Sequence, residues 1–192
     1  GVLAPKSKSD LAFTMHMLAW LSTAGTAAIV EFPGVLYRGG AEQKIRKYLI
    51  DNNYVDTVIQ LPANLFFGVS IATCIIVLKK SKFENKTLFI DASQLFVHEG
   101  NKNKLSPENI DAIVAEYAEH KQVKHFSALV DNKVVAENGY NLSVSSYVGA
   151  EDTRPKTDIR ELNERIRRIV AHENELRADI DAIIAELEAE TL

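Results

Sequence analysis

The chain is poor in the residues that build covalent and metal-based frameworks. It has a single cysteine, Cys74, so no intrachain disulfide or multi-cysteine metal site can form within its 192 residues. Cys74 lies in an apolar run, and we expect it to be a small buried hydrophobic side chain in a reducing compartment. The five histidines are scattered without metal-ligand spacing, so we expect surface or structural roles for them and no metal site.

Long apolar runs and an excess of basic residues are missing too. No stretch is long and apolar enough to span a bilayer, so we expect a cytoplasmic protein without a membrane partner. The chain has 22 Lys and Arg against 26 Asp and Glu, a net charge of −4. This balance disfavours a stand-alone DNA-binding protein, because duplex affinity depends mainly on phosphate contacts by basic residues.

The sequence also has no G-x-G pattern, the glycine spacing with which many α/β proteins approach a dinucleotide or cofactor. The first residues, Gly1–Pro5, contain no Met and no basic segment followed by an apolar run. We therefore interpret them neither as a signal peptide nor as a natural start, and we expect the chain to be a piece of a longer polypeptide.

Helical and strand patterns alternate along the first half of the chain. Helical spacing of apolar residues predicts helices over residues 10–21, with Ser9 or Asp10 as the cap, and over residues 41–51. Apolar runs bounded by Gly or Pro predict strands over residues 26–32, 55–61, 71–78 and 87–91. This order is typical of half of an α/β sheet.

The segment Ala72–Leu78 is apolar at nearly every position, which indicates a strand covered on both faces, near the middle of a sheet. The connection of residues 62–70 that precedes it is short and has no helical pattern. Because a parallel crossover needs a longer connection, we expect this strand to be antiparallel and to lie between the strands 26–32 and 55–61.

Beyond residue 100 the pattern is more mixed. We expect a polar loop at 101–104, a helix opened by Ser106-Pro107-Glu108 that ends near His120, short strands over 121–146 and a linker at 151–156. These signals predict two domains, an α/β body over residues 1–150 and a C-terminal helix over residues 157–190.

The C-terminal helix has an apolar seam. Its members recur at alternating steps of three and four residues, with only Glu173 breaking the series, which indicates a coiled-coil-like helix that associates with a partner: Ile159, Leu162, Ile166, Ile169, Leu176, Ile180, Ile183 and Leu187.

The strongest candidate for a binding site is the segment Leu61–Ser70, which follows a predicted strand. Ligands of open α/β sheets bind beyond the carboxyl ends of the strands. Two adjacent aromatic rings in this segment offer a flat surface to a base that has been flipped out of a duplex. The alternative is a hydrophobic plug that closes the sheet. The candidate pocket residues are Pro62, Asn64, Phe66, Phe67 and Gly68.

Two further segments have a binding and a structural interpretation. Arg38-Gly39-Gly40 could approach a phosphate, because glycines let the backbone come close, or it could form the turn before the helix at 41. A basic cluster follows the apolar strand and is either a solvated strand end, which we favour, or a DNA contact: Lys79, Lys80, Lys82 and Lys86.

Four groups of residues stand out in order along the chain: Pro5–Phe13 with Met15–Leu18; Gly34–Glu42 with Ile45 and Arg46; Leu61–Gly68 with Ile71 and Thr73; and Gly139–Leu142 with Ser146–Val148. Together they resemble the modification subunits of type I restriction-modification systems, which are adenine-specific DNA methyltransferases. The resemblance covers residues about 2–150, and Val69-Ser70 departs from the Gly-Thr-type residues of many relatives.

The resemblance implies a fold and a reaction. The fold is the C-terminal half of a Rossmann-like methyltransferase sheet followed by a long helix, and the reaction transfers a methyl group from S-adenosylmethionine to the exocyclic amine of adenine in DNA. In this family the cofactor binds a glycine-rich loop, and an Asn-Pro-Pro-aromatic motif holds the amine. Since no proline of this chain follows an Asn, we expect no catalytic residue in it.

The family also implies partners. A specificity subunit reads the DNA site, a restriction subunit completes the complex, and DNA is bound by the assembled enzyme. Two functions remain open for the chain itself. It is either an inactive C-terminal part of the enzyme, or an interaction module that acts through its C-terminal helix.

Overall fold

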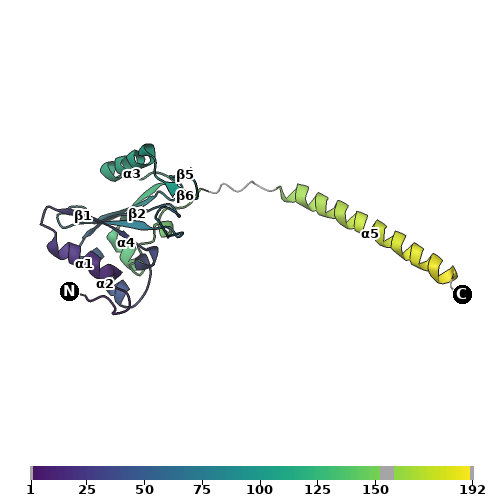
Figure 1. Cartoon of the computed structure of the whole chain (residues 1–192), viewed down its shortest axis with the longest axis horizontal. Helices are drawn as coiled ribbons and strands as arrows, with labels where there is room; N and C mark the ends of the chain where they lie inside the picture. The colour runs from purple at the N-terminus through teal and green to yellow at the C-terminus, as the bar shows by residue number, and fades with distance from the viewer. Residues whose placement is uncertain (1, 152–157, 191–192) are drawn as a thin grey trace. The chain divides into compact units, whose positions relative to one another are not determined.

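The computed structural model describes residues 2–151 and 158–190, which divide into two compact units (Figure 1). The first unit ends at Glu151 and contains a five-stranded sheet, a small hairpin and four α-helices. The second contains one helix, α5 (Ile159–Glu190). Apart from Glu151, the predicted linker lies outside the described residues. No helix among the described residues is long and apolar enough to cross a membrane.

The sheet of the first unit has the strand order β1-β3-β2-β4-β7. Its strands are β1 (Thr26–Glu31), β2 (Val55–Gln60), β3 (Cys74–Lys79), β4 (Lys86–Asp91) and β7 (Ser127–Asp131). The first unit therefore has a mixed α/β sheet, as expected from the sequence. One outer edge of the sheet is formed by β1 and the other by β7.

The position of β3 between β1 and β2 was predicted from its apolar sequence and from the short loop before it, and it is confirmed. β3 pairs antiparallel with β1, with Ile76 opposite Ile29, and antiparallel with β2, with Ile76 opposite Val58. The strand begins at Cys74, three residues later than expected, because the preceding loop continues to Thr73. Cys74 is fully buried, as predicted.

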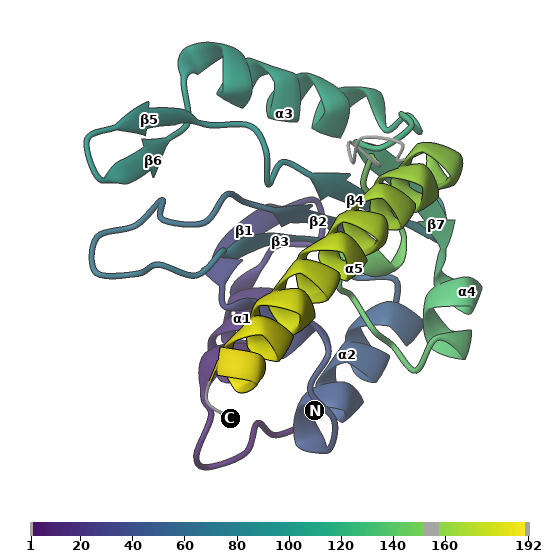
Figure 2. The ribbon, with the colours of Figure 1, turned by 90° about the vertical axis from the view of Figure 1, so that its right-hand side faces the viewer.

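The helices lie on both faces of the sheet (Figures 1 and 2). One face carries α1 (Asp10–Trp20), α2 (Ala41–Asp51) and α4 (Asn132–Glu137), together with the short helices η1 (Pro33–Leu36) and η2 (Val144–Ser146). The other face carries only α3 (Pro107–Glu119), which packs over β4 and β2. Because side chains alternate along a strand, each strand contributes to both cores.

Several local expectations need correction. Ser9 precedes α1, but its backbone is helical and its side chain makes no cap hydrogen bond, so the predicted cap is wrong. The expected polar loop at 101–104 is the tip and second strand of a hairpin, β5 (Val97–Glu99) and β6 (Lys102–Lys104). The region 121–146 contains the unforeseen helix α4 as well as β7.

The basic cluster after β3 is not the solvated strand end that we favoured. Lys79 Nζ lies 3.1 Å from the buried carboxylate of Asp56, and Lys80 Nζ donates to the Leu21 carbonyl. Lys82 Nζ donates to the carbonyl of Val55, and burial lowers the pKa of this amine to about 8. Only Lys86 of the four is exposed.

The second unit is one helix of 32 residues. The seam side chains from Ile159 to Ile183 are exposed, and Leu187 continues the same row. Arg168–Glu164 and His172–Glu175 pairs lie on its surface at helical spacing. A lone amphipathic helix has no second element in its own unit against which its apolar stripe can pack.

A buried arginine ties the first unit together. Arg46 of α2 is 1% exposed. Its guanidinium donates from Nη1 to the carbonyl of Val35 and from Nε to the carbonyl of Tyr140, both at 2.8 Å. Burial lowers the pKa of Arg46 to about 10, and nearby Glu42 opposes this shift. One side chain thus joins η1, α2 and the segment after α4.

We expect Arg46→Ala to lower the free energy of unfolding of the chain by about 3 kcal/mol, since two carbonyls lose their charged donor inside the core. Urea unfolding followed by circular dichroism measures this change. The matched control is Lys44→Ala on the exposed side of the same helix, which should change the free energy by less than about 0.5 kcal/mol. Equal stability of the two variants would contradict the assignment.

Candidate functional site

The candidate site is the loop between β2 and β3, at the carboxyl end of β2. Its two ends are held together, because Leu61 N donates to the Thr73 carbonyl at 2.9 Å and Gln60 Nε2 donates to the same carbonyl at 3.1 Å. The Thr73 hydroxyl is buried and has no hydrogen-bond partner among the described residues. The loop therefore leaves the sheet from a fixed base.

The five candidate pocket residues differ in how the structure places them. Pro62 is buried and anchors the base of the loop, whereas Phe67 is 99% and Phe66 is 40% exposed. Asn64 and Gly68 have positive φ angles of 55° and 72°. A glycine adopts this conformation without steric cost, and asparagine tolerates it better than most residues. The aromatic pair is exposed between these two bends, while Leu61 and Leu65 of the same loop pack against the core under α3.

The Arg38-Gly39-Gly40 segment is placed at the turn before α2. The guanidinium of Arg38 packs over Gly34, where a Cβ would lie 2.3 Å from it, and approaches Glu42 at 3.4 Å. Gly39 and Gly40 are exposed, and a Cβ built at either would meet no atom within 4 Å. The glycines leave room for a ligand, while the Arg38 side chain is engaged internally. The phosphate contact stays a prediction.

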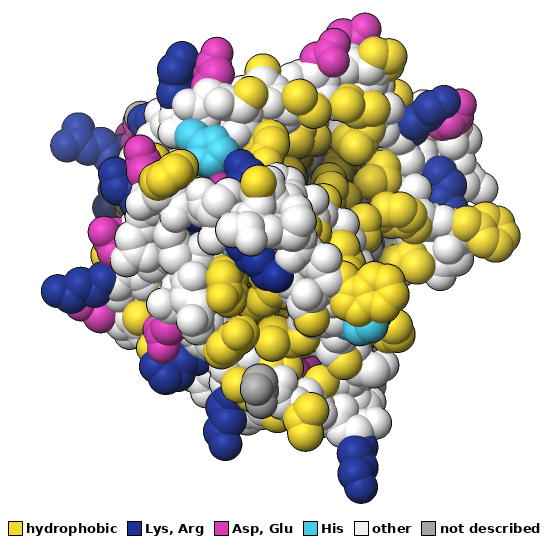
Figure 3. All heavy atoms as spheres, turned by 90° about the vertical axis from the view of Figure 1, so that its left-hand side faces the viewer, with side chains coloured by type: hydrophobic (Ala, Val, Ile, Leu, Met, Phe, Trp, Pro, Cys, Tyr) yellow, Lys and Arg dark blue, Asp and Glu magenta, His cyan; other side chains and the backbone are white. Residues whose placement is uncertain are grey.

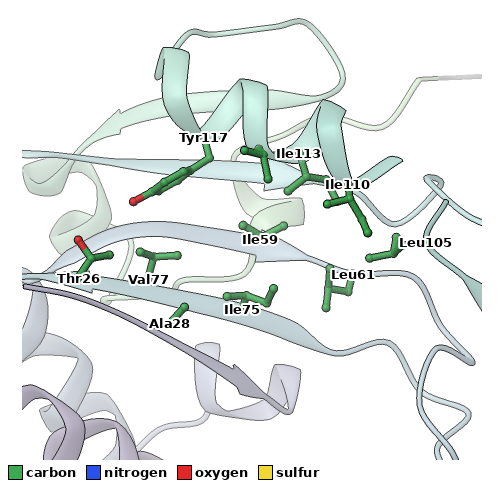
Figure 4. A pocket seen from close by; sticks show the side chains of 11 residues that line it. Thr26, Ala28, Ile59, Leu61, Ile75, Val77, Leu105, Ile110, Ile113 and Tyr117 are labelled. Carbon is green, nitrogen blue, oxygen red and sulfur yellow. The ribbon is translucent and has the colours of Figure 1, made fainter. Parts of the chain in front are cut away.

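A hydrophobic surface surrounds the β1 edge of the sheet (Figure 3). Its exposed side chains come from α1, β1 and the residue after β1: Phe13, Trp20, Val30 and Phe32. A groove of about 330 Å³ lies on the face of the sheet that carries α3, between the strands and this helix (Figure 4). Apolar side chains from β2, β3 and α3 line it, among them Ile59, Ile75, Val77, Ile113 and Val114.

Two buried polar clusters were not foreseen from the sequence. At the carboxyl end of β1, the Thr14 hydroxyl donates to Glu31 Oε1 at 3.0 Å, and burial raises the pKa of Glu31. Burial also raises the pKa of the neighbouring Cys74 thiol to about 12, which disfavours the reactive thiolate form. Thr14, Glu31 and Cys74 are far apart in the sequence, and no local pattern of charge or spacing predicts that they meet in the fold.

The second cluster centres on Asp56, at the other end of the sheet. Its Oδ2 lies 3.1 Å from Lys79 Nζ and 3.6 Å from His120 Nε2, and it accepts a hydrogen bond from the Thr57 hydroxyl at 3.1 Å. Lys79 Nζ also lies 5.0 Å from the centre of the Tyr117 ring. These contacts tie α3 to the sheet and lie away from the aromatic loop.

Known proteins with a similar sequence share this mixed sheet and identify its family. The family model described as N-6 DNA Methylase matches residues 1–156. The MpnII methylase subunit of a type I restriction enzyme from Mycoplasma pneumoniae is 48% identical over 191 residues, which cover 99% of this chain and 35% of that protein.

Solved structures from type I restriction-modification systems are also similar to this chain. The methyltransferase subunit of a type I restriction-modification system from Streptococcus thermophilus is 43% identical, with a TM-score of 0.74, over 76% of this chain and 31% of that one. A chain from a structure on complex assembly and conformational transition of the type I restriction-modification system is 21% identical, with a TM-score of 0.61, and shares the fold over 91% of this chain and 40% of that one.

The fold therefore matches part of the fold of type I DNA methyltransferase subunits. The chain belongs to the N-6 DNA methylase family of adenine-specific DNA methyltransferases, and within it to the type I methylase subunits. It spans about a third of the length of the curated relatives it matches.

Proposed function

We propose that this chain is the C-terminal part of a type I methylase subunit, and that it supplies the loop that holds the target adenine and the helix that docks a partner subunit. The whole enzyme transfers a methyl group from S-adenosylmethionine to the N6 amine of adenine in DNA. The observation that carries this proposal is the exposed aromatic pair Phe66-Phe67 beyond the carboxyl end of β2 in a chain of this family.

The loop suits a flipped base. A base removed from the duplex loses its stacking, and an aromatic ring restores part of it, with about 1–3 kcal/mol per base. Phe66 and Phe67 are turned outward by the bends at Asn64 and Gly68. In this proposal one ring stacks on adenine, while Pro62 fixes the base of the loop and the Arg38–Gly40 turn is a secondary candidate for a DNA phosphate.

We propose that the S-adenosylmethionine site lies mainly outside the described residues. The groove under α3 has no charged side chain that could pair with the carboxylate or ammonium of the cofactor. The polar hollow near Asp56 lies at the end of the sheet opposite the carboxyl end of β2, where ligands of such sheets bind. We therefore assign the cofactor site and the Asn-Pro-Pro motif to the other two thirds of the enzyme, and expect this chain alone to be inactive.

The helix α5 is assigned to subunit association. Its seam is exposed from Ile159 to Ile183, and rows of Ile and Leu in water are unfavourable by about 25 cal/mol for each Å² of apolar surface. We propose that the specificity subunit covers this seam with its own helices, and that the restriction subunit and DNA join through the assembled complex. One relative in fold comes from a structure on complex assembly in the type I system, which supports this assignment.

We expect Phe66→Ala or Phe67→Ala in the full-length enzyme to lower the single-turnover methylation rate by about 10- to 100-fold, the equivalent of one lost stack. The rate is measured with tritiated S-adenosylmethionine and a duplex that carries the target site. Phe83→Ala is the matched control, because Phe83 is also fully exposed but lies in the turn between β3 and β4. An unchanged methylation rate in both loop variants would contradict the base-stacking role.

We expect the double variant Ile166→Asp with Ile180→Asp to abolish assembly with the specificity subunit, since two carboxylates would be buried in an apolar seam without partners. Size-exclusion chromatography with light scattering measures the assembly. The double variant Ala171→Asp with Ala178→Asp places the same charges on the opposite side of the helix and should assemble normally. If the seam variant still assembles, α5 is not the docking element.

A further inference from the structure

The small hairpin β5–β6 lies beside the aromatic loop, and both extend from the same side of the first unit (Figure 2). The hairpin pairs Val97 with Lys104, His98 with Asn103, and Glu99 with Lys102. It adds no strand to the main sheet and contributes little to either core. Its position beside the loop therefore calls for another explanation.

Three hydrogen bonds run from the hairpin to consecutive parts of the loop backbone. Asn103 Nδ2 donates to the carbonyl of Ala63 at 2.8 Å, and the backbone N–H of Asn103 donates to the carbonyl of Asn64 at 3.1 Å. Lys102 Nζ donates to the carbonyl of Phe66 at 3.2 Å. The hairpin thus holds the part of the loop that leads into the aromatic pair.

The antiparallel pairing of β5 with β6 explains why a backbone N–H of β6 faces the loop. In an antiparallel pair, residues alternate between those whose backbone groups face the partner strand and those whose groups face outward. Asn103 gives its N–H to Asn64, so its backbone faces away from β5 and toward the loop. One backbone hydrogen bond and two side-chain hydrogen bonds therefore link β6 to the loop.

The loop has few bonds of its own that could replace this support. Within it, Asn64 N donates to the Ser70 carbonyl at 3.3 Å, and Val69 N donates to the Phe66 carbonyl at 3.2 Å. Asn64 is also held in a left-handed conformation, which is costly unless neighbouring contacts stabilise it. The Asn103 amide and backbone bind the carbonyls on either side of this bend.

We propose that the hairpin β5–β6 is a brace for the target-base loop, and that Asn103 is a positioning residue that sets where Phe66 and Phe67 stand when adenine is flipped. This inference rests on the proposed role of the loop in holding the base. Asn103 itself does not touch the base. It acts by keeping the loop ordered before DNA arrives, so that less conformational entropy is lost when the base stacks.

The test uses the full-length methylase with its specificity subunit and a duplex in which 2-aminopurine replaces the methylated adenine. Because this base fluoresces when it leaves the stack, the signal reports its position in the pocket. Asn103→Ala and the isosteric Asn103→Asp both remove the amide donor to Ala63, and each should cut the fluorescence gain and the single-turnover rate about tenfold. Duplex Kd should change by less than about twofold, because the phosphate contacts remain.

The matched control is Asn101→Ala, at the tip of the same hairpin, which should leave both signals unchanged. Asn103→Gln keeps an amide donor on a longer side chain and should recover part of the rate. A role in stability alone would lower the melting temperature but leave the fluorescence gain and rate per folded enzyme at the wild-type level, and that result in the Ala and Asp variants would overturn the brace.

Phe66→Ala and Phe67→Ala are measured in parallel to separate two failures. If they lower the fluorescence gain while Asn103→Ala and Asn103→Asp do not, the loop holds the base and the brace is wrong. If all four variants behave as the wild type, the base-holding role of the loop is wrong and the brace fails with it.

Discussion

The short connection between β2 and β3 is the constraint on which the arrangement of the first unit depends. It runs from Leu61 to Thr73 without forming a helix, and β3 returns antiparallel beside β2. That return inserts β3 between β2 and β1, and it leaves the connection exposed beyond the carboxyl end of β2. The same connection therefore accounts for the position of β3 and for the projecting aromatic loop, and the hairpin β5–β6 then holds that loop from outside.

Packing on the two faces of the sheet is unequal in a chain that spans about a third of the length of its curated relatives. One face is sealed by three α-helices and by the buried guanidinium of Arg46, which joins segments about a hundred residues apart. On the other face α3 covers only part of the strands, so an apolar groove and the β1 edge stay open. Contiguous exposed apolar patches on a protein domain often mark places where other protein segments pack.

The sequence predicted the main sheet because its signals were local and strong. The apolar run Ala72–Leu78 and the short loop before it were enough to place β3 and its direction. The hairpin at Val97–Lys104 was missed because its side chains are polar and exposed, so it has no alternating apolar pattern. The ion pair between Lys79 and the buried Asp56 was missed because pairing between strands depends on register, which no local pattern reveals.

The sequence alone identified the candidate loop, from its aromatic pair and its place after a strand. The supporting hairpin β5–β6 could be recognised only from the three-dimensional structure. The central claim is that this chain holds the base while the rest of the enzyme holds the cofactor. Calorimetric titration of S-adenosylmethionine into the isolated chain and into the full-length methylase tests it most directly. The account predicts saturable binding by the full-length protein and no saturable heat for the chain. Micromolar binding by the isolated chain would contradict the account, because it would place the cofactor site within these residues.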